Sequence, residues 1–353
     1  MNTKPLNILS DDLDAVLDRT KPMWEGIRGS RIFIAGGTGF FGCWLLESFA
    51  WANEKLDLRA SVTALTRNPD AFHRKAPHLC ENPAIELLPG DVRTFDFPKG
   101  PFSHVVNAVV DSSSDNSLPN PLRMMDTVVT GTRRTLDLAL SCGAEKYLYT
   151  STGAIYGNPP QDMALIPETF FGDVECSDPA RMYNETRRFA EMLCAVYASQ
   201  SSLKVKTARG FAFVGPYLPL DGGFAAGNFI RDAMNGGPII VKGDGSPLRS
   251  YLYAADLAEW LWTILFKGQS SRPYNLGSEE AISIRDLAYL VADVFGGVEV
   301  SITGNPNSGV AGNRYVPATE RARSELGLEQ RTSLRDSIER TVRWHKQRAS
   351  MEE

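Results

Sequence analysis

The chain has 353 residues, of which 43% are hydrophobic and 22% charged, and its formal net charge is −5. This length and composition suit one large globular domain or two smaller ones, and they exclude a largely disordered chain. The mild negative charge argues against nucleic acid or an anionic membrane as the main partner, and no apolar run approaches the roughly 20 residues of a membrane-spanning helix.

Residues 1–29 precede the first expected strand. Their apolar members recur at helical spacing, which predicts a short amphipathic helix packed on the domain. The segment is polar and acidic, unlike a signal peptide. The five cysteines and four histidines lack the spacing of a disulfide framework or a metal site, so we predict a cytoplasmic protein with reduced thiols and no metal. In the helix predicted within residues 1–29, the apolar positions are Leu9, Leu13, Val16 and Leu17.

Residues 31–42 carry the most informative pattern in the chain. A short apolar strand runs into a turn with glycines three residues apart, and residues 39–53 then read as a helix. Such glycines allow a tight turn, close approach of the backbone to a pyrophosphate, and close packing of the helix on the strand. The pyrophosphate would lie on the free N–H groups at the helix start. This predicts dinucleotide binding by Gly36, Gly39, Phe40, Phe41 and Gly42.

Strands and helices alternate from here to about residue 211. This alternation predicts an α/β fold with a Rossmann-type, doubly wound parallel sheet, in which ligands bind at the carboxyl ends of the strands. A serine-rich stretch, residues 112–117, predicts a loop at the mouth of the pocket. The expected strands are residues 31–35, 60–66, 84–88, 103–110, 145–151 and 203–211, and the expected helices are 39–53, 121–142 and 178–200.

The second expected strand ends at Thr66 and is followed by Arg67. An NAD site usually has an acid there for the ribose 2′-hydroxyl, whereas a guanidinium suits a 2′-phosphate. We therefore favour NADP over NAD, with a solvated Arg67 in an NAD enzyme as the alternative. Asp91 and Val92, after the third strand, have the composition of an adenine contact, and Asp91 equally suits a turn. Ala108 is a further predicted cofactor contact.

Glycine and proline become frequent after about residue 211, where short elements follow one another. This predicts a smaller C-terminal substrate lobe, partly interleaved with the main domain. We expect residues 1–29 to form a helical extension, 30–210 with about 238–270 the dinucleotide-binding domain, and 211–237 with 271–347 the substrate lobe. The later elements are expected at residues 224–235, 238–242, 253–267, 272–276, 281–295, 297–303 and 331–347.

Two further segments carry side chains suited to chemistry. Residues 150–157 read Thr-Ser-Thr-Gly-Ala-Ile-Tyr-Gly at a strand end, and residues 183–187 read Tyr-Asn-Glu-Thr-Arg at the head of a helix. With the glycine turn and the stretch at residues 243–258, they resemble an extended short-chain dehydrogenase/reductase, the nucleotide-sugar epimerase/dehydratase family. The resemblance covers roughly residues 30–345.

The resemblance implies an enzyme that oxidises a hydroxyl of a nucleotide-diphosphate sugar with bound NAD(P). Tyr183 would be the base for the hydroxyl proton, and Thr152 would hold the same oxygen. A tyrosine can be a base only when its pKa, about 10 in water, is lowered, and a cation at i+4 favours the phenolate. Arg187 stands there in place of the family's lysine. The resemblance also implies that Tyr183 and Arg187 contact the cofactor, since an arginine can hydrogen-bond its ribose. Arginine cannot relay a proton, which leaves an active enzyme or a weakened, specialised site as the two interpretations.

Gly153 and Ala154 follow Thr152. In the family's 4,6-dehydratases an Asp-Glu pair follows the threonine, and in its sugar-acid decarboxylases a glutamate stands at the second position. This chain has no carboxylate at either place, which favours oxidation and re-reduction like that of a 4-epimerase. Dehydratase, decarboxylase and ketoreductase activities are the alternatives, as is a non-catalytic protein that senses NAD(P) or serves as a scaffold.

The resemblance also implies substrate contacts. Arg249 would bind the diphosphate, since arginine suits bidentate phosphate binding, with Asn228 and Phe229 near the sugar and base. Arg231 and Arg321 are weaker candidates.

The family pairs the helices expected at residues 121–142 and 178–200 across a two-fold axis, which implies a homodimer. The alternative is that their apolar residues face the sheet. The residues expected to meet a partner are Met124, Val128, Leu136, Met192 and Val196.

Overall fold

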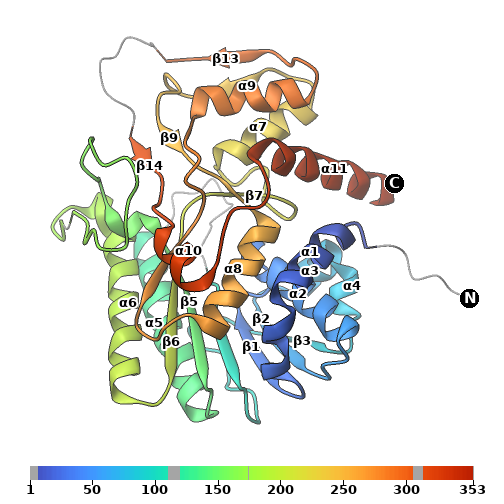
Figure 1. The fold of residues 1–353 in the computed structure, drawn as a ribbon, viewed down its shortest axis with the longest axis vertical. Coiled ribbons are helices and arrows are strands. Elements are labelled where there is room, and N and C mark those ends of the chain that lie inside the picture. Colours follow the sequence, from blue (N-terminus) through green and yellow to red (C-terminus); the bar gives the residue numbers. More distant parts are fainter. Residues whose placement is uncertain (1–6, 110–119, 174, 305–312, 353) are drawn as a thin grey trace, which may run out of the picture.

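A seven-stranded parallel sheet forms the centre of the molecule (Figure 1). The computed structural model describes residues 7–109, 120–173, 175–304 and 313–352. The strands are β1 (Arg31–Ala35), β2 (Ser61–Thr66), β3 (Ile85–Pro89), β4 (His104–Asn107), β5 (Lys146–Thr152), β6 (Lys204–Gly210) and β11 (Pro273–Leu276), and their order is β11-β6-β5-β4-β1-β2-β3. The chain turns outward in opposite directions from β1, so the crevice between β1 and β4 is the switch point at which such folds bind ligands. The predicted fold class is confirmed.

Both faces of this sheet are covered by helices. Alternate residues of β1 enter different cores, since Ile32 and Ile34 pack in one apolar cluster and Phe33 packs in the other. This two-sided burial explains why the strands read as continuous apolar runs. The first cluster takes in α1 (Ser10–Thr20), α2 (Phe40–Lys55) and α8 (Ala254–Lys267), and the second takes in α5 (Pro121–Ser141) and α6 (Met182–Gln200).

The amphipathic helix predicted near the N-terminus is present as α1. Its apolar side belongs to the same cluster as α2 and α8, and Trp24, in the 3-10 turn Lys21–Ile27 that follows, is fully buried. This segment therefore packs on the Rossmann domain as predicted.

A smaller lobe lies beyond the carboxyl ends of the strands, in the upper part of Figure 1. Its core joins α7 (Ala225–Met234) and α9 (Ile284–Val294) with the strand pair β8 (Ile239–Val241) and β13 (Val300–Ile302). The last helix, α11 (Leu334–Glu352), contributes Ile338 and Val342 to the same core.

Two short segments lie elsewhere than the sequence indicated. Residues 272–276 were expected in the smaller lobe, but β11 pairs with β6 as the seventh strand of the main sheet. Residues 238–242 were expected with the main domain, but β8 packs in the core of the smaller lobe. Each is a strand of only three or four residues, and so short a strand carries no local information about which sheet it joins. The division of the whole chain into domains stays a prediction.

Three of the five residues expected at a dimer face are buried instead. Met124, Val128 and Leu136 of α5 are at most 9% exposed, and the last two pack in the cluster beneath the helix. Met192 and Val196 of α6 are exposed as expected. The error arises because the apolar stripe of α5 faces the sheet.

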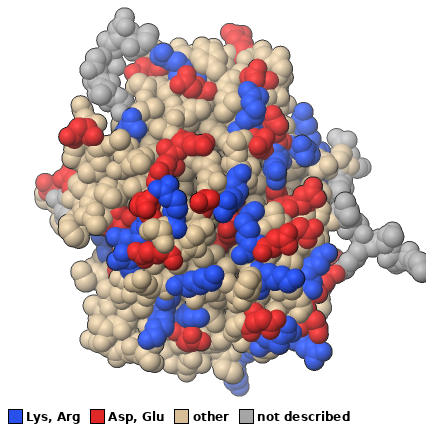
Figure 2. Space-filling model, in the orientation of Figure 1, with Lys and Arg blue, Asp and Glu red and all other residues tan. Residues whose placement is uncertain are grey.

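None of the helices within the described ranges is long and apolar enough to cross a membrane. The serine-rich stretch expected as a pocket loop and the end of the strand expected at 103–110 lie outside the described residues. Figure 2 shows basic and acidic side chains interspersed over the face of the molecule that is seen in Figure 1.

The remaining described elements are short. They are α3 (Pro69–Lys75), α4 (Pro77–Cys80), η2 (Gly153–Tyr156), η3 (Pro179–Arg181), β7 (Phe213–Val214), β9 (Leu248–Arg249), β10 (Leu252–Tyr253), β12 (Ile282–Ser283), β14 (Arg314–Tyr315) and α10 (Glu320–Leu326).

Candidate active site

The glycine turn between β1 and α2 leaves no room for side chains at Gly36 and Gly42. Gly36 has φ +78°, and a Cβ there would lie 2.7 Å from the carbonyl oxygen of Ala108. A Cβ on Gly42 would lie 2.3 Å from the carbonyl oxygen of Gly36. These contacts hold the ends of β1, β4 and α2 together, which is the close packing that the sequence predicted.

The third glycine is different, because Gly39 borders space that the described protein atoms do not fill. A Cβ there would meet only the Gly36 carbonyl oxygen, at 3.4 Å. Gly39 is also the N-cap of α2, and no side chain caps this helix. The first turn, with Phe40 and Phe41, therefore offers backbone N–H groups without intrahelical acceptors. This arrangement fits a pyrophosphate.

Two threonine hydroxyls meet at the carboxyl end of β2. The Oγ1 atoms of Thr38 and Thr66 lie 3.1 Å apart, and the backbone N–H of Asn68 donates to Thr66 at 3.3 Å. Arg67 follows with its side chain exposed. Thr66 stands where an NAD site usually has a carboxylate for the ribose 2′-hydroxyl.

The two residues predicted to contact adenine, Asp91 and Val92, are engaged by other residues of the protein. Arg93 donates to both carboxylate oxygens of Asp91, each at 2.9 Å, and this pairing lowers the pKa of Asp91 to about 2. Val92 is buried and packs against Gly131 of α5. Asp91 thus fixes the loop after β3. Its carboxylate is occupied by Arg93, so only its backbone groups are available to a ligand.

Tyr183 and Arg187 lie one turn apart at the head of α6. The Cζ atom of Arg187 lies 5.4 Å from the centroid of the Tyr183 ring, so the guanidinium is stacked beside the phenol. The i+4 relationship predicted from sequence therefore brings the two side chains together.

Arg187 is almost completely buried, with 1% of its surface exposed. Its guanidinium donates to the Tyr149 hydroxyl at 3.2 Å and to the carbonyl oxygens of Thr150 at 3.5 Å and Val109 at 3.4 Å. Burial alone would lower the pKa of Arg187, but the phenols of Tyr149 and Tyr183 outweigh it and raise the pKa above its usual value. The side chain is a permanent cation with no carboxylate partner among the described residues.

Thr152 ends β5 and contacts a residue that sequence reasoning missed. Its Oγ1 lies 3.5 Å from the hydroxyl of Tyr315, which also donates to the carbonyl oxygen of Gly210 at 3.4 Å. Burial raises the pKa of Tyr315, the Thr152 hydroxyl partly offsets this rise, and the nearby phenol of Tyr183 adds to it. Thr152, Tyr183 and Tyr315 therefore form one cluster.

Arg249, the predicted diphosphate ligand, borders the same cluster. Its Cζ atom lies 5.7 Å from the centroid of the Tyr315 ring, and β9 and β14 pair in register so that these two residues are neighbours. The guanidinium donates to the carbonyl oxygens of Leu248 and Asn313 at 2.8 and 2.9 Å. Tyr315 thus lies between Thr152 and Arg249.

The space over Gly153 is filled by an aromatic ring. A Cβ on Gly153 would lie 2.6 Å from Phe211 Cζ. Phe211 in turn packs on Tyr315, with ring centroids 4.6 Å apart, and on Tyr156 at 6.1 Å. The position that holds an aspartate in the family's dehydratases therefore faces an aromatic wall.

The other predicted substrate contacts, in α7, are engaged by neighbours within the smaller lobe. Phe229 is buried in the core of the smaller lobe, and Arg231 pairs with its neighbour Asp232. Asn228 accepts a hydrogen bond from Arg231 at 3.4 Å. Phe229 thus has a packing role in the fold. The sequence does not reveal this role, because a single aromatic residue in a short helix gives no sign of whether it is buried.

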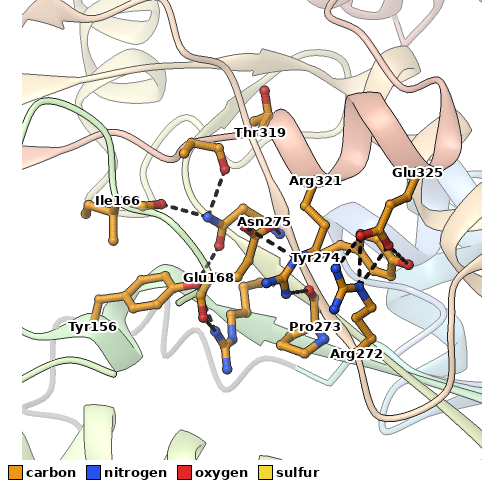
Figure 3. A network of polar contacts seen from close by, with 12 residues as sticks. Tyr156, Ile166, Glu168, Arg272, Pro273, Tyr274, Asn275, Thr319, Arg321 and Glu325 are labelled. Atoms are coloured by element: carbon orange, nitrogen blue, oxygen red, sulfur yellow. Dashed lines mark hydrogen bonds and ion pairs between the residues drawn. The ribbon is translucent and has the colours of Figure 1, made fainter. Parts of the chain in front are cut away.

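Arg321 belongs to a separate polar network that joins α10 to β11 (Figure 3). Its guanidinium donates to the carbonyl oxygen of Pro273 at 2.7 Å and lies 3.9 Å from the Glu168 carboxylate. Glu168 also accepts the backbone N–H of Asn275, whose side chain accepts the Tyr156 hydroxyl at 2.7 Å. The Arg321 guanidinium is directed at these groups, so it supports the fold beside the site. Within the described residues, no cluster of histidine, cysteine and carboxylate side chains could hold a metal ion.

Comparison with known proteins agrees with this geometry. The sequence profile described as "NAD dependent epimerase/dehydratase family" matches residues 32–277. UDP-glucuronic acid decarboxylase 1 of Arabidopsis thaliana is 29% identical over 321 residues, which cover 91% of this chain and 71% of that protein. The protein of the same name from Xenopus tropicalis is 29% identical over 89% of this chain and 72% of its own length.

Solved structures show the same fold at lower identity. An epimerase from Methanothermobacter thermautotrophicus has a TM-score of 0.77 at 21% identity and covers 95% of this chain and 96% of its own. A dTDP-glucose 4,6-dehydratase from Streptomyces venezuelae, with NAD bound, has a TM-score of 0.76 at 22% identity, over 91% and 98% of the two chains. A UDP-glucuronic acid 4-epimerase from Bacillus cereus in complex with NAD has a TM-score of 0.74 at 18% identity, over 90% and 99%.

Proposed function

The chain belongs to the NAD-dependent epimerase/dehydratase family, and within it we propose an enzyme that oxidises a nucleotide-diphosphate hexose to a transient keto-sugar and then returns the hydride, as a 4-epimerase does. The observation that carries this proposal is the cluster of Thr152, Tyr183 and Tyr315 beside Arg249, with Phe211 filling the space over Gly153. The cluster supplies groups for moving a hydroxyl proton and for binding phosphate, and it supplies none for elimination.

The chemistry follows from these side chains. Tyr183 takes the proton of a sugar hydroxyl while Thr152 hydrogen-bonds the same oxygen. The hydrogen on the carbon that carries this hydroxyl leaves as hydride. NAD(P), when bound, would supply the acceptor and later the donor of this hydride. On the return step Tyr183 gives the proton back to the oxygen. Arg187 stabilises the negative phenol oxygen through its fixed charge and takes no proton itself.

The relatives that are UDP-glucuronic acid decarboxylases offer the main alternative. The family's decarboxylases and dehydratases carry carboxylates after the threonine, whereas this chain carries Gly153 and Ala154. A side chain at Gly153 would meet the Phe211 ring at 2.6 Å. The packing leaves no room for the dehydratase aspartate at position 153, and Ala154 lacks the carboxylate of the decarboxylase glutamate. Together these two features favour simple oxidation and reduction over loss of water or carbon dioxide.

The test is incubation with UDP-, dTDP-, GDP- and CDP-linked hexoses and uronic acids in D₂O, followed by NMR of the products. Internal return of hydride gives a stereoisomer without deuterium at the reacting carbon, and this is the expected outcome. Loss of water with uptake of deuterium, or release of carbon dioxide, would replace the epimerase by a dehydratase or decarboxylase. Absence of any turnover with cofactor confirmed bound would favour a sensing or scaffold protein.

For the cofactor we propose NADP rather than NAD. The family requires a nicotinamide dinucleotide, and NAD is bound in the similar structures from Streptomyces venezuelae and Bacillus cereus. In this chain Thr66 and Arg67 occupy the strand end where an NAD site has its carboxylate. The combination of a missing acid and an exposed guanidinium supports a phosphorylated ribose.

We also propose a homodimer formed through α5 and α6. These helices lie side by side, and α6 exposes Phe189 and Met192, the latter with 61% of its surface, while α5 exposes Leu122 and Met125. An apolar surface of this kind is typical of an interface between subunits. Met192→Glu is expected to shift the protein from dimer to monomer in light scattering, whereas Tyr289→Glu, at an exposed aromatic of the smaller lobe, is not.

A further inference from the structure

A lysine outside the predicted cofactor contacts reaches the glycine turn. Lys75 is the last residue of α3, and its Nζ donates to the carbonyl oxygen of Thr38 at 3.0 Å. Thr38 is the residue whose hydroxyl lies 3.1 Å from that of Thr66. The ammonium group is thus held at the strand end where the adenosine ribose of a dinucleotide binds.

The lysine is positioned on a second side by an aromatic ring. The Nζ atom lies 5.5 Å from the centroid of the Tyr217 ring, which is within the range of a cation–π contact. Tyr217 is itself fixed, because its hydroxyl donates to the buried carboxylate of Glu47 at 2.5 Å. Lys75 is therefore oriented before any ligand arrives, which reduces the entropy lost on binding.

Neither cation at this strand end has a carboxylate of its own. Among the described residues, no acidic side chain lies within ion-pair distance of Arg67 or Lys75. The nearest candidates are engaged elsewhere, since Asp91 is held by Arg93 and Glu47 accepts from Tyr217 and His78. The Lys75 ammonium group and the hydroxyls of Thr38 and Thr66 thus lie at the strand end that Arg67 follows, and such cations and hydroxyls are groups that bind a phosphate monoester.

From this arrangement we infer that Lys75 is the second cationic contact for the 2′-phosphate of the cofactor, in addition to Arg67 and the hydroxyls of Thr38 and Thr66. The inference rests on the proposed use of NADP and deepens it. An ammonium group has three donors, so Lys75 can keep its bond to the Thr38 carbonyl oxygen while it donates to the phosphate. Binding therefore requires no rearrangement of the glycine turn.

The test is calorimetric binding of two fragments that differ only in the phosphate, adenosine 2′,5′-bisphosphate and adenosine 5′-monophosphate, to the full chain. The ratio of their dissociation constants isolates the 2′-phosphate. The wild-type protein is expected to bind the bisphosphate more than 10-fold tighter, and Lys75→Gln is expected to reduce this preference about 10- to 100-fold, since a charge-assisted hydrogen bond is lost. Binding of the monophosphate should change little.

Three variants sharpen the result. Lys75→Arg keeps the charge and should keep most of the preference, and Arg67→Gln combined with Lys75→Gln should abolish it. Arg74→Gln removes an equal charge from an exposed neighbour on the same helix and should leave the preference unchanged. Circular dichroism and thermal melting confirm that each variant is folded.

Two outcomes would overturn the inference. If Lys75→Gln weakens both fragments equally, Lys75 only braces the glycine turn. If the wild-type protein shows no preference for the bisphosphate, the 2′-phosphate site is absent. Because fragment binding needs no sugar, a retained preference together with no turnover of any nucleotide sugar would count against the proposed reaction alone.

Discussion

The guanidinium of Arg187 lies 5.4 Å from the centre of the Tyr183 ring, and its hydrogen bonds within the described residues go to neutral oxygen atoms. A buried cation without a carboxylate partner among the described residues keeps its charge available to the two phenols beside it, Tyr149 and Tyr183, and burial raises the pKa of Tyr149 to about 12. In the proposed reaction, Arg187 therefore keeps the electrostatic role that the family's lysine has at this position.

Replacement of Arg187 by lysine tests whether the arginine is adapted to this site. A single ammonium cannot reach the Tyr149 hydroxyl and the Val109 carbonyl oxygen together, so Arg187→Lys is expected to lower kcat and to cost about 1–3 kcal/mol of stability. Steady-state kinetics and urea unfolding measure the two effects. A variant that gains activity over an inactive wild type would instead favour the sensing or scaffold function.

Tyr183→Phe removes the proposed base with little change in shape. The expected result is a fall in kcat of about 10²- to 10⁴-fold, the range that general acid–base groups supply, while cofactor binding is retained. Tyr315→Phe serves as the control, because that hydroxyl contacts Thr152 and Gly210 without taking the substrate proton in the proposed reaction. If kcat falls equally in Tyr183→Phe and Tyr315→Phe, Tyr183 is not distinguished as the base from its neighbour Tyr315.

The parts of the site that lie within one local pattern could be predicted from sequence. The glycine turn is a strand, a turn and a helix start in 12 consecutive residues, 31–42, and Tyr183 and Arg187 are related by one helical turn. Their spacing alone specifies their geometry. The doubly wound sheet follows similarly from the alternation of apolar strands with helices.

Tyr315 could not be found in this way. It lies in a two-residue strand paired with β9, and its contact with Thr152 joins residues 163 positions apart. No periodicity marks such a residue, because its role depends on how the smaller lobe closes over the sheet. Arg321 shows the reverse error, since a lone arginine gives no sign that Pro273 and Glu168 already engage it.

The stability of the protein is expected to fall in mild acid because of His104. This residue is 1% exposed, and burial lowers its pKa to about 4 from the usual 6.5. Protons therefore bind the unfolded chain more strongly than the folded one between these values, so the contribution is intact above pH 6.5 and lost as the pH falls towards 4. The loss amounts to about 3 kcal/mol.

His104→Asn isolates this effect, because asparagine can retain the hydrogen bond that Nδ1 makes with the Ser103 hydroxyl at 2.8 Å. Urea unfolding of both proteins between pH 7 and 4 should show a shallower decline in the variant. Part of the decline should persist, since burial also lowers the pKa of His345 to about 4. Parallel curves for the two proteins would assign the acid sensitivity to other groups.

The contact between Gly153 and Phe211 gives a prediction that links stability to reaction type. A Cβ at position 153 would lie 2.6 Å from the Phe211 ring, so Gly153→Ala is expected to destabilise the protein by about 1–3 kcal/mol through overpacking. Combining Gly153→Ala with Phe211→Leu should recover part of that loss, because the smaller side chain frees space, and the two changes should be non-additive in thermal melts. Additive losses would mean that the ring is not what excludes a side chain. Recovery would show that Phe211 and Gly153 act as a pair, so that a carboxylate for elimination could enter this site only together with a smaller residue at 211.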